Sequence, residues 1–73
     1  MVEKAEEYLK ECGLSEVRVR CQGSTARIEI PQEELKHFFN KYNFSDLVQY
    51  FSNLGFNCTS LDLEGLVSGK LNR

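Results

Sequence analysis

The segment 15–30, SEVRVRCQGSTARIEI, constrains the fold most, because polar and apolar side chains alternate on both sides of a Gly-Ser pair. Such a pattern is typical of a β-hairpin. Successive side chains of a strand point to opposite faces of the sheet. The expected apolar face carries Val17, Val19, Cys21, Ala26, Ile28 and Ile30. The expected polar face carries Arg18, Arg20, Gln22, Thr25, Arg27 and Glu29.

Three arginines on the open face of a hairpin form a candidate anion-binding platform. Guanidinium groups bind phosphate and carboxylate oxygens in pairs, and neighbouring acids can orient them. A charged open face is equally typical of an antiparallel sheet with one side in water. The alternation alone is therefore compatible with an anion site and with an ordinary solvated face.

The chain length limits the architecture. With 73 residues, 41% of them hydrophobic and 27% charged, the composition indicates one small folded domain that spans residues 1–73. A chain of this size can pack one layer of helices on one sheet, but it cannot enclose a deep pocket.

Charge and cysteine content exclude several functions. Nine basic against eleven acidic residues argue against a general nucleic-acid binder. Cys12, Cys21 and Cys58 show no CxxC spacing and His37 is the single histidine, so neither a disulfide framework nor a metal site is indicated. We expect all three cysteines to be small buried apolar residues.

Neither a leader sequence nor a membrane span is indicated by the hydropathy pattern. The sequence therefore favours a cytoplasmic protein with no membrane partner.

Three helices are predicted from apolar spacing and from start and stop signals. The first covers residues 2–12 and ends at Gly13. The second begins at Pro31, and its expected buried stripe is Leu35, Phe38, Phe39 and Tyr42. The third opens with an Asn43–Asp46 capping pair and ends at Gly55. Its expected inward residues are Leu47, Val48, Phe51 and Leu54.

Residues 57–63 predict a third strand, with Thr59, Leu61 and Leu63 toward the helices and Ser60 and Asp62 on the arginine side. The predicted class is α+β in the order αββααβ, a three-stranded mixed sheet with helices on one face. A helical crossover makes the second and third strands parallel. We favour the first strand at the centre, although the third strand beside the second is the open alternative.

Several motifs, taken together, resemble a known family. The runs VRVRCQGSTARIEIP, LGFNCTSLDLEG and SGKLN are similar to the C-terminal domain of PP-loop ATP pyrophosphatases that act as ATP-dependent sacrificial sulfur transferases in nickel-pincer nucleotide cofactor biosynthesis. The likeness covers about residues 6 to 72. The residues that match the family's motifs are Arg18, Arg20, Arg27, Glu29, Asp62, Glu64 and Gly65.

In that family the PP-loop domain binds ATP and adenylates a pyridine-dicarboxylate mononucleotide, and one of its cysteines donates sulfur. The C-terminal domain supplies arginines near the substrate phosphate and makes subunit contacts. The resemblance thus implies a non-catalytic accessory domain. The phosphate-binding residues would be Arg18, Arg20, Arg27 and Asp62, and the supporting residues Glu29, Ser60 and Glu64.

Departures from the family limit this inference. The ATP-binding SGGxDS loop is absent, and none of the three cysteines occupies the place of the sulfur donor. The resemblance therefore implies no cofactor in this chain and no catalytic or metal-binding residues. ATP-Mg would belong to a PP-loop domain present in cis or in trans, and the assembly could be a homo-oligomer. The tail Leu66–Lys70 also differs, with Leu66-Val67 in place of Tyr-Arg and Lys70 in place of a serine.

A second function fits the same residues. The arginine side of the sheet could dock an acidic segment of a partner protein and bind no small molecule. An independent enzyme is the least favoured, because no nucleophile is paired with a base in the sequence pattern.

Overall fold

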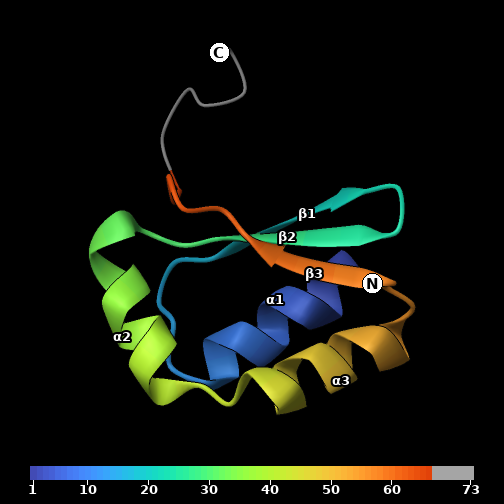
Figure 1. Ribbon diagram of the computed structural model, residues 1–73, viewed down its shortest axis with the longest axis horizontal. Helices are drawn as coiled ribbons and strands as arrows, with labels where there is room; N and C mark the ends of the chain where they lie inside the picture. Colours follow the sequence, from blue (N-terminus) through green and yellow to red (C-terminus); the bar gives the residue numbers. More distant parts are fainter. Residues whose placement is uncertain (67–73) are drawn as a thin grey trace.

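A computed structural model of the chain describes residues 1–66 and shows three helices on one side of a three-stranded sheet (Figure 1). The elements in chain order are α1 (Val2–Glu11), β1 (Arg18–Gln22), β2 (Thr25–Glu29), a short 3₁₀ helix η1 (Gln32–Glu34), α2 (Leu35–Lys41), α3 (Phe44–Leu54) and β3 (Cys58–Leu61). The predicted α+β class and the order αββααβ are confirmed. The divergent tail beyond Leu66 lies outside the described residues.

The hairpin is present as predicted, and its strands are antiparallel. Arg18 pairs with Glu29, Val19 with Ile28 and Arg20 with Arg27. Because successive side chains point to opposite faces, the arginines lie on one face of the sheet and the branched aliphatic residues lie on the face that the helices cover.

The sheet order is β1-β2-β3, so β2 is central and the expectation of a central β1 is wrong. β3 does run parallel to β2, as predicted. The outer edge of β1 is not open, because the Val19 N–H donates to Glu6 Oε2 of α1 at 2.9 Å. A carboxylate thus satisfies one backbone donor at the outer edge of β1, while β3 pairs with the other edge of the hairpin, along β2.

The core lies between the sheet and the helices α1 and α3. Ala5, Leu9 and Phe51 from these helices are fully buried. They pack with the branched aliphatic residues of the hairpin, among them Val19 and Ile28. Burial of these apolar surfaces is the main source of stability in a chain of this length.

Both predicted glycine stops are present. Beyond Gly13, the Leu14 N–H donates to Leu9 O at 3.3 Å, and beyond Gly55 the Phe56 N–H donates to Phe51 O at 3.1 Å. These bonds are those of helix ends with a left-handed glycine, followed by a buried apolar residue. The start of α3 is also as predicted, since Asn43 Oδ1 accepts from the Asp46 N–H at 3.1 Å.

Three residues predicted to face inward are exposed: Phe39 at 49%, Val48 at 48% and Leu63 at 68%. The second helix begins as a 3₁₀ turn and continues for only seven residues, so only part of its predicted stripe reaches the core. β3 ends at Leu61, so the strand alternation no longer applies to Leu63.

Tyr42 directly follows α2 and links the end of this helix to the end of α1. Its hydroxyl donates to Cys12 O at 2.7 Å. Burial raises the pKa of Tyr42 above its ordinary value. The bond ties together two segments that are 30 residues apart in sequence.

The expectation of three buried cysteines is wrong for Cys21 and Cys58, which are exposed, while Cys12 is half-buried. Cys21 lies next to the hairpin turn, where its thiol contacts Gly23 O at 3.3 Å. Cys58 pairs in register with Thr25 and therefore lies on the polar face of the sheet. All three are free cysteines.

Residues 1–66 contain neither a metal-binding cluster nor a membrane-spanning helix. No cluster of three or more histidine, cysteine or carboxylate side chains in this range has the arrangement to hold a metal ion. Within the same range, every helix is too short or too polar to cross a membrane.

Gly65 is the glycine whose replacement should disturb the fold most. Its φ is +82°, and a Cβ atom there would lie 2.6 Å from Ile30 O and 3.0 Å from Gln32 N. We expect Gly65→Ala to lower the free energy of unfolding by at least about 1 to 2 kcal/mol, the cost of a left-handed residue that carries a Cβ. Urea unfolding measures this loss. Gly23→Ala is the control, since it shares the positive φ but has open space around it.

Candidate functional site

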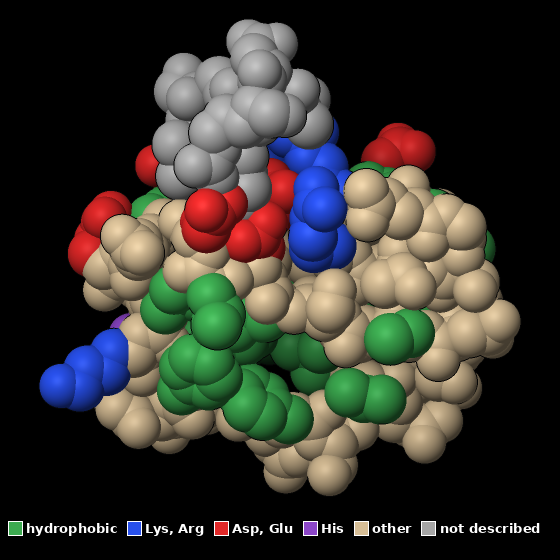
Figure 2. Space-filling model, turned by 45° about the horizontal axis from the view of Figure 1, so that its top comes forward, with side chains coloured by type: hydrophobic (Ala, Val, Ile, Leu, Met, Phe, Trp, Pro, Cys, Tyr) green, Lys and Arg blue, Asp and Glu red, His purple; other side chains and the backbone are tan. Residues whose placement is uncertain are grey.

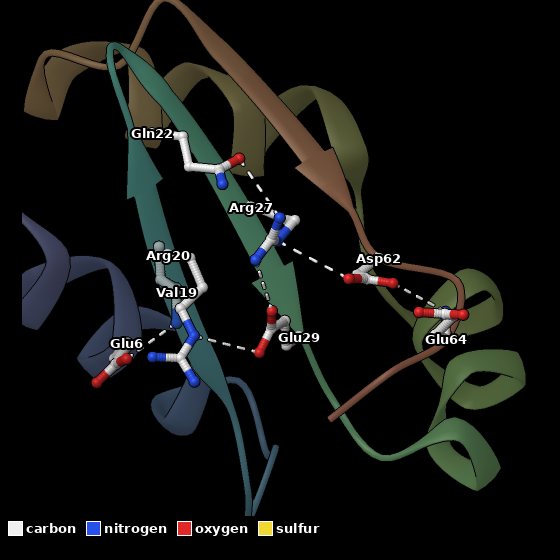
Figure 3. Close-up of polar contacts among 8 residues, drawn as sticks. All are labelled: Glu6, Val19, Arg20, Gln22, Arg27, Glu29, Asp62 and Glu64. Atoms are coloured by element: carbon white, nitrogen blue, oxygen red, sulfur yellow. Dashed lines mark hydrogen bonds and ion pairs between the residues drawn. The ribbon is translucent and has the colours of Figure 1, made fainter. Parts of the chain in front are cut away.

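The polar face of the sheet brings together side chains from β1, from β2 and from the turn after β3 (Figure 3). We call it the arginine face and define it by Arg18, Arg20, Arg27, Glu29 and Asp62. The register sets Arg20 directly opposite Arg27, and Glu29 directly opposite Arg18. Ser60 of β3 pairs with Arg27 on the other side.

Glu29 lies at the centre of the arginine face and is only 2% exposed. Its Oε1 is 3.3 Å from Arg20 Nε, and its Oε2 is 3.1 Å from Arg27 Nη2. The sequence placed Glu29 on an open face, whereas the structure buries it between two guanidinium groups. A carboxylate in this position compensates both charges and fixes the orientation of both arginines.

Arg27 is held by three different side chains. Its Nη1 donates to Gln22 Oε1 at 3.4 Å, its Nη2 contacts Glu29, and its Nε lies 3.8 Å from Asp62 Oδ2. Within residues 1–66, Nε is buried and makes no hydrogen bond, so its contact with Asp62 is a longer ion pair. Arg27 therefore organises the arginine face, and its predicted contact with a phosphate stays a prediction.

Arg20 and Arg18 are arranged differently. Within residues 1–66, Arg20 is engaged through its Nε alone, and its two terminal nitrogens point away from Glu29 (Figure 3). Arg18 is exposed, and its guanidinium makes no hydrogen bond or ion pair inside the described range. The two residues are two positions apart on β1 and therefore share a face of the sheet. Together they offer guanidinium groups that an anion can reach.

Asp62 and Glu64 belong to the turn that follows β3. Asp62 Oδ1 accepts from the Glu64 N–H at 2.9 Å, while Oδ2 faces Arg27. Asp62 therefore positions Arg27 and its own turn. Its carboxylate orients the Arg27 guanidinium, and its predicted part in a phosphate site stays a prediction. Ser60 is half-buried and adjoins the helices α2 and α3 as well as Arg27.

A polar hollow of about 360 Å³ adjoins Arg18. Its charged lining residues from α1 and the following loop are Glu6, Lys10 and Glu16. Glu6 and Lys10 lie on the polar side of an ordinary amphipathic helix, so the sequence pattern did not mark them as site residues. Only the packing of α1 along β1 places them beside Arg18.

Comparison with known proteins supports a coarse relationship. No family model matches the chain. The chain is 49% identical over 72 residues to an uncharacterized protein of Synechocystis, which covers 99% of this chain and 27% of that protein. It is 41% identical over 69 residues to the pyridinium-3,5-bisthiocarboxylic acid mononucleotide synthase of Lactiplantibacillus plantarum, which covers 93% of this chain and 24% of the synthase.

The chain spans about a quarter of the length of these curated relatives. The second match agrees with the family that the motifs indicated, without locating the matched quarter within the synthase. Over nearly its whole length, the chain is therefore similar to one part of a pyridinium-3,5-bisthiocarboxylic acid mononucleotide synthase.

Proposed function

We propose that this chain is a non-catalytic accessory domain, of the C-terminal type, in a PP-loop ATP-dependent sulfur transferase. In this role it binds the phosphate group of a nucleotide-like substrate and contacts neighbouring subunits. The observation that supports the proposal most is the pair Arg18 and Arg20, whose guanidinium groups are accessible on one face of β1. The similarity to a mononucleotide synthase supports it independently, since a mononucleotide carries a phosphate.

The two arginines differ in how they are prepared for an anion. Arg20 is held at its Nε by the buried carboxylate of Glu29, so its terminal nitrogens keep a fixed direction. Less side-chain entropy is then lost when an anion binds. Arg18 is exposed and supplies a second positive charge. Arg27 and Asp62 stabilise this arrangement from the other side of Glu29.

The chemistry of the reaction would lie in another domain. ATP-Mg and the sulfur-donating cysteine are assigned to a PP-loop domain, in cis or in trans, as the family resemblance implies. This chain would hold the phosphate end of the substrate and leave the reacting carboxylate to that domain. Binding energy at a remote phosphate is a general means of positioning the reacting group.

Removing one accessible arginine tests the proposal. We expect Arg18→Ala and Arg20→Ala each to weaken binding of nicotinic acid mononucleotide by about 1 to 3 kcal/mol, the range for hydrogen bonds to charged groups. The measurement is an amide NMR titration of the isolated chain, with inorganic phosphate as the second ligand. Lys36→Ala is the matched control, because it removes the same charge from an exposed position of α2.

Two outcomes would contradict the proposal. One is an unchanged affinity in a folded Arg18→Ala, Arg20→Ala double variant. The other is the absence of shifts at millimolar mononucleotide, which would favour a face that docks an acidic protein segment. Saturable shifts at Arg18 and Arg20 that are larger for the mononucleotide than for phosphate would support substrate binding.

A further inference from the structure

A second surface, distinct from the arginine face, is apolar and lies between α2, α3 and β3. It is a hollow of about 200 Å³. The residues that define this apolar hollow here are Phe38, Phe39, Phe44, Leu47, Val48 and Leu61. Figure 2 shows hydrophobic side chains gathered around a recess, next to the acidic and basic side chains of the neighbouring surface.

The hydrophobic side chains at the rim of the apolar hollow are exposed to solvent. Phe39, Phe44 and Val48 are 49%, 42% and 48% exposed. The rings of Phe39 and Phe44 contact each other, and their centroids are 5.8 Å apart. The exposed side chains at the rim therefore form one contiguous patch. The whole lining, which also includes Ile28, Thr59 and Ser60, contains no charged side chain. A contiguous apolar patch around a recess is typical of a surface that another protein covers.

The adjoining strand edge is also open. β3 is the last strand of the sheet, and within residues 1–66 no strand pairs with its outer side. The Asp62 N–H points to β2, where it donates to Ile28 O at 2.9 Å. Because successive backbone groups of a strand alternate in direction, the N–H and C=O groups of Leu61 point outward. The edge of β1 differs, since Glu6 accepts the Val19 N–H there.

We propose that the apolar hollow and the outer edge of β3 dock the part of the sulfur transferase that this chain does not contain. The inference rests on the proposed function. Both curated relatives are about four times as long as the region that matches this chain, so each has ample further polypeptide to cover this patch. The open edge of β3 fits an extended segment, and the uncharged lining of the hollow fits a segment without charge. An apolar side chain of this segment would insert between Phe39, Val48 and Leu61.

The test compares the isolated chain with a chimera in which the chain replaces the 72 matching residues of the Synechocystis relative. Hydrogen exchange followed by mass spectrometry is measured on both. In the chimera we expect amides of β3 and of the Phe39–Val48 region to exchange at least about tenfold more slowly, the sign of suppressed local opening. Peptides from β1 should change much less.

A matched pair of substitutions locates the contact. In the chimera, Phe39→Asp should remove the added protection, because it places a charge on the apolar rim. Asn40→Asp adds the same charge at the next, exposed position of α2 and should leave the protection unchanged. Equal effects of the two substitutions, or protection confined to β1, would overturn the docking proposal.

If the chimera does not fold, a measurement on the isolated chain still tests the proposal. Sedimentation should show a monomer at the concentrations used for NMR. A dimer that Phe39→Asp dissociates would overturn the proposal, because a second copy would then occupy the hollow. The mononucleotide titration uses the arginine face alone, so a failure of phosphate binding and a failure of docking give separate results.

Discussion

Replacement of Phe51 by alanine should largely unfold this protein. Phe51 is fully buried, and its ring centroid lies 5.8 Å from that of Phe56 and 6.4 Å from those of Tyr8 and Tyr50. We expect the free energy of unfolding to fall by about 3 to 5 kcal/mol, the cost of removing a buried phenyl ring and leaving a cavity. A single core in a chain of this size rarely supplies more than about 3 to 5 kcal/mol of stability, so this loss is as large as the whole. Urea unfolding followed by circular dichroism measures the loss.

Val48→Ala is the control for this prediction. Val48 lies on the same helix but is 48% exposed, so its truncation removes little buried surface. We expect a change of less than about 1 kcal/mol, in line with exposed positions. Similar losses for Phe51→Ala and Val48→Ala would show that α3 does not pack on the sheet through Phe51.

Removal of the Glu29 carboxylate should have the second-largest effect. Glu29→Ala leaves Arg20 and Arg27 without the acid that lies between them, and it opens a space in a region that is only 2% exposed. We expect a loss of about 1.5 to 3 kcal/mol in the free energy of unfolding, the range for hydrogen bonds to charged groups. The estimate is lower than for a fully buried ion pair because both arginines retain contact with water.

The same variant should affect ligand binding through Arg20. Without Glu29 the Arg20 guanidinium loses its fixed direction, so we expect weaker mononucleotide binding and averaged Nε–H signals for Arg20 in NMR spectra. Glu29→Gln, which keeps the size of the side chain, should recover part of the stability but not the ion pairs. Glu33→Ala, an exposed acid of η1, is the charge-matched control. A Glu29→Ala variant with wild-type stability would show that the buried carboxylate does not hold the arginine face together.

Much of the fold was predictable from local pattern. Alternation around Gly23 predicted the hairpin, and the glycines at 13 and 55 predicted two helix ends, because each signal acts within a few residues. Solvent exposure was less predictable. Phe39 and Val48 have helical spacing for burial, but the shortness of α2 leaves both at the rim of a hollow.

The sequence predicted which residues gather at the candidate site, but it did not predict what each of them contacts there. Strand alternation placed Arg18, Arg20, Arg27 and Glu29 on one face, and the structure brings them together there. The pattern could not show that Arg27 is engaged at three nitrogens while Arg20 is engaged at one. Such differences depend on distances of a few tenths of an ångström between side chains of different strands.

The sequence by itself determined the elements, their chain order and the face on which each strand residue lies, because backbone geometry and side-chain periodicity are local properties. Tertiary structure alone decided which strand is central, because the sequence pattern is compatible with β3 beside either strand of the hairpin. It also decided that Glu29 is buried and that the rim of the apolar hollow is exposed. These features depend on segments far apart in the chain, whose relative positions follow from the packing of the whole core.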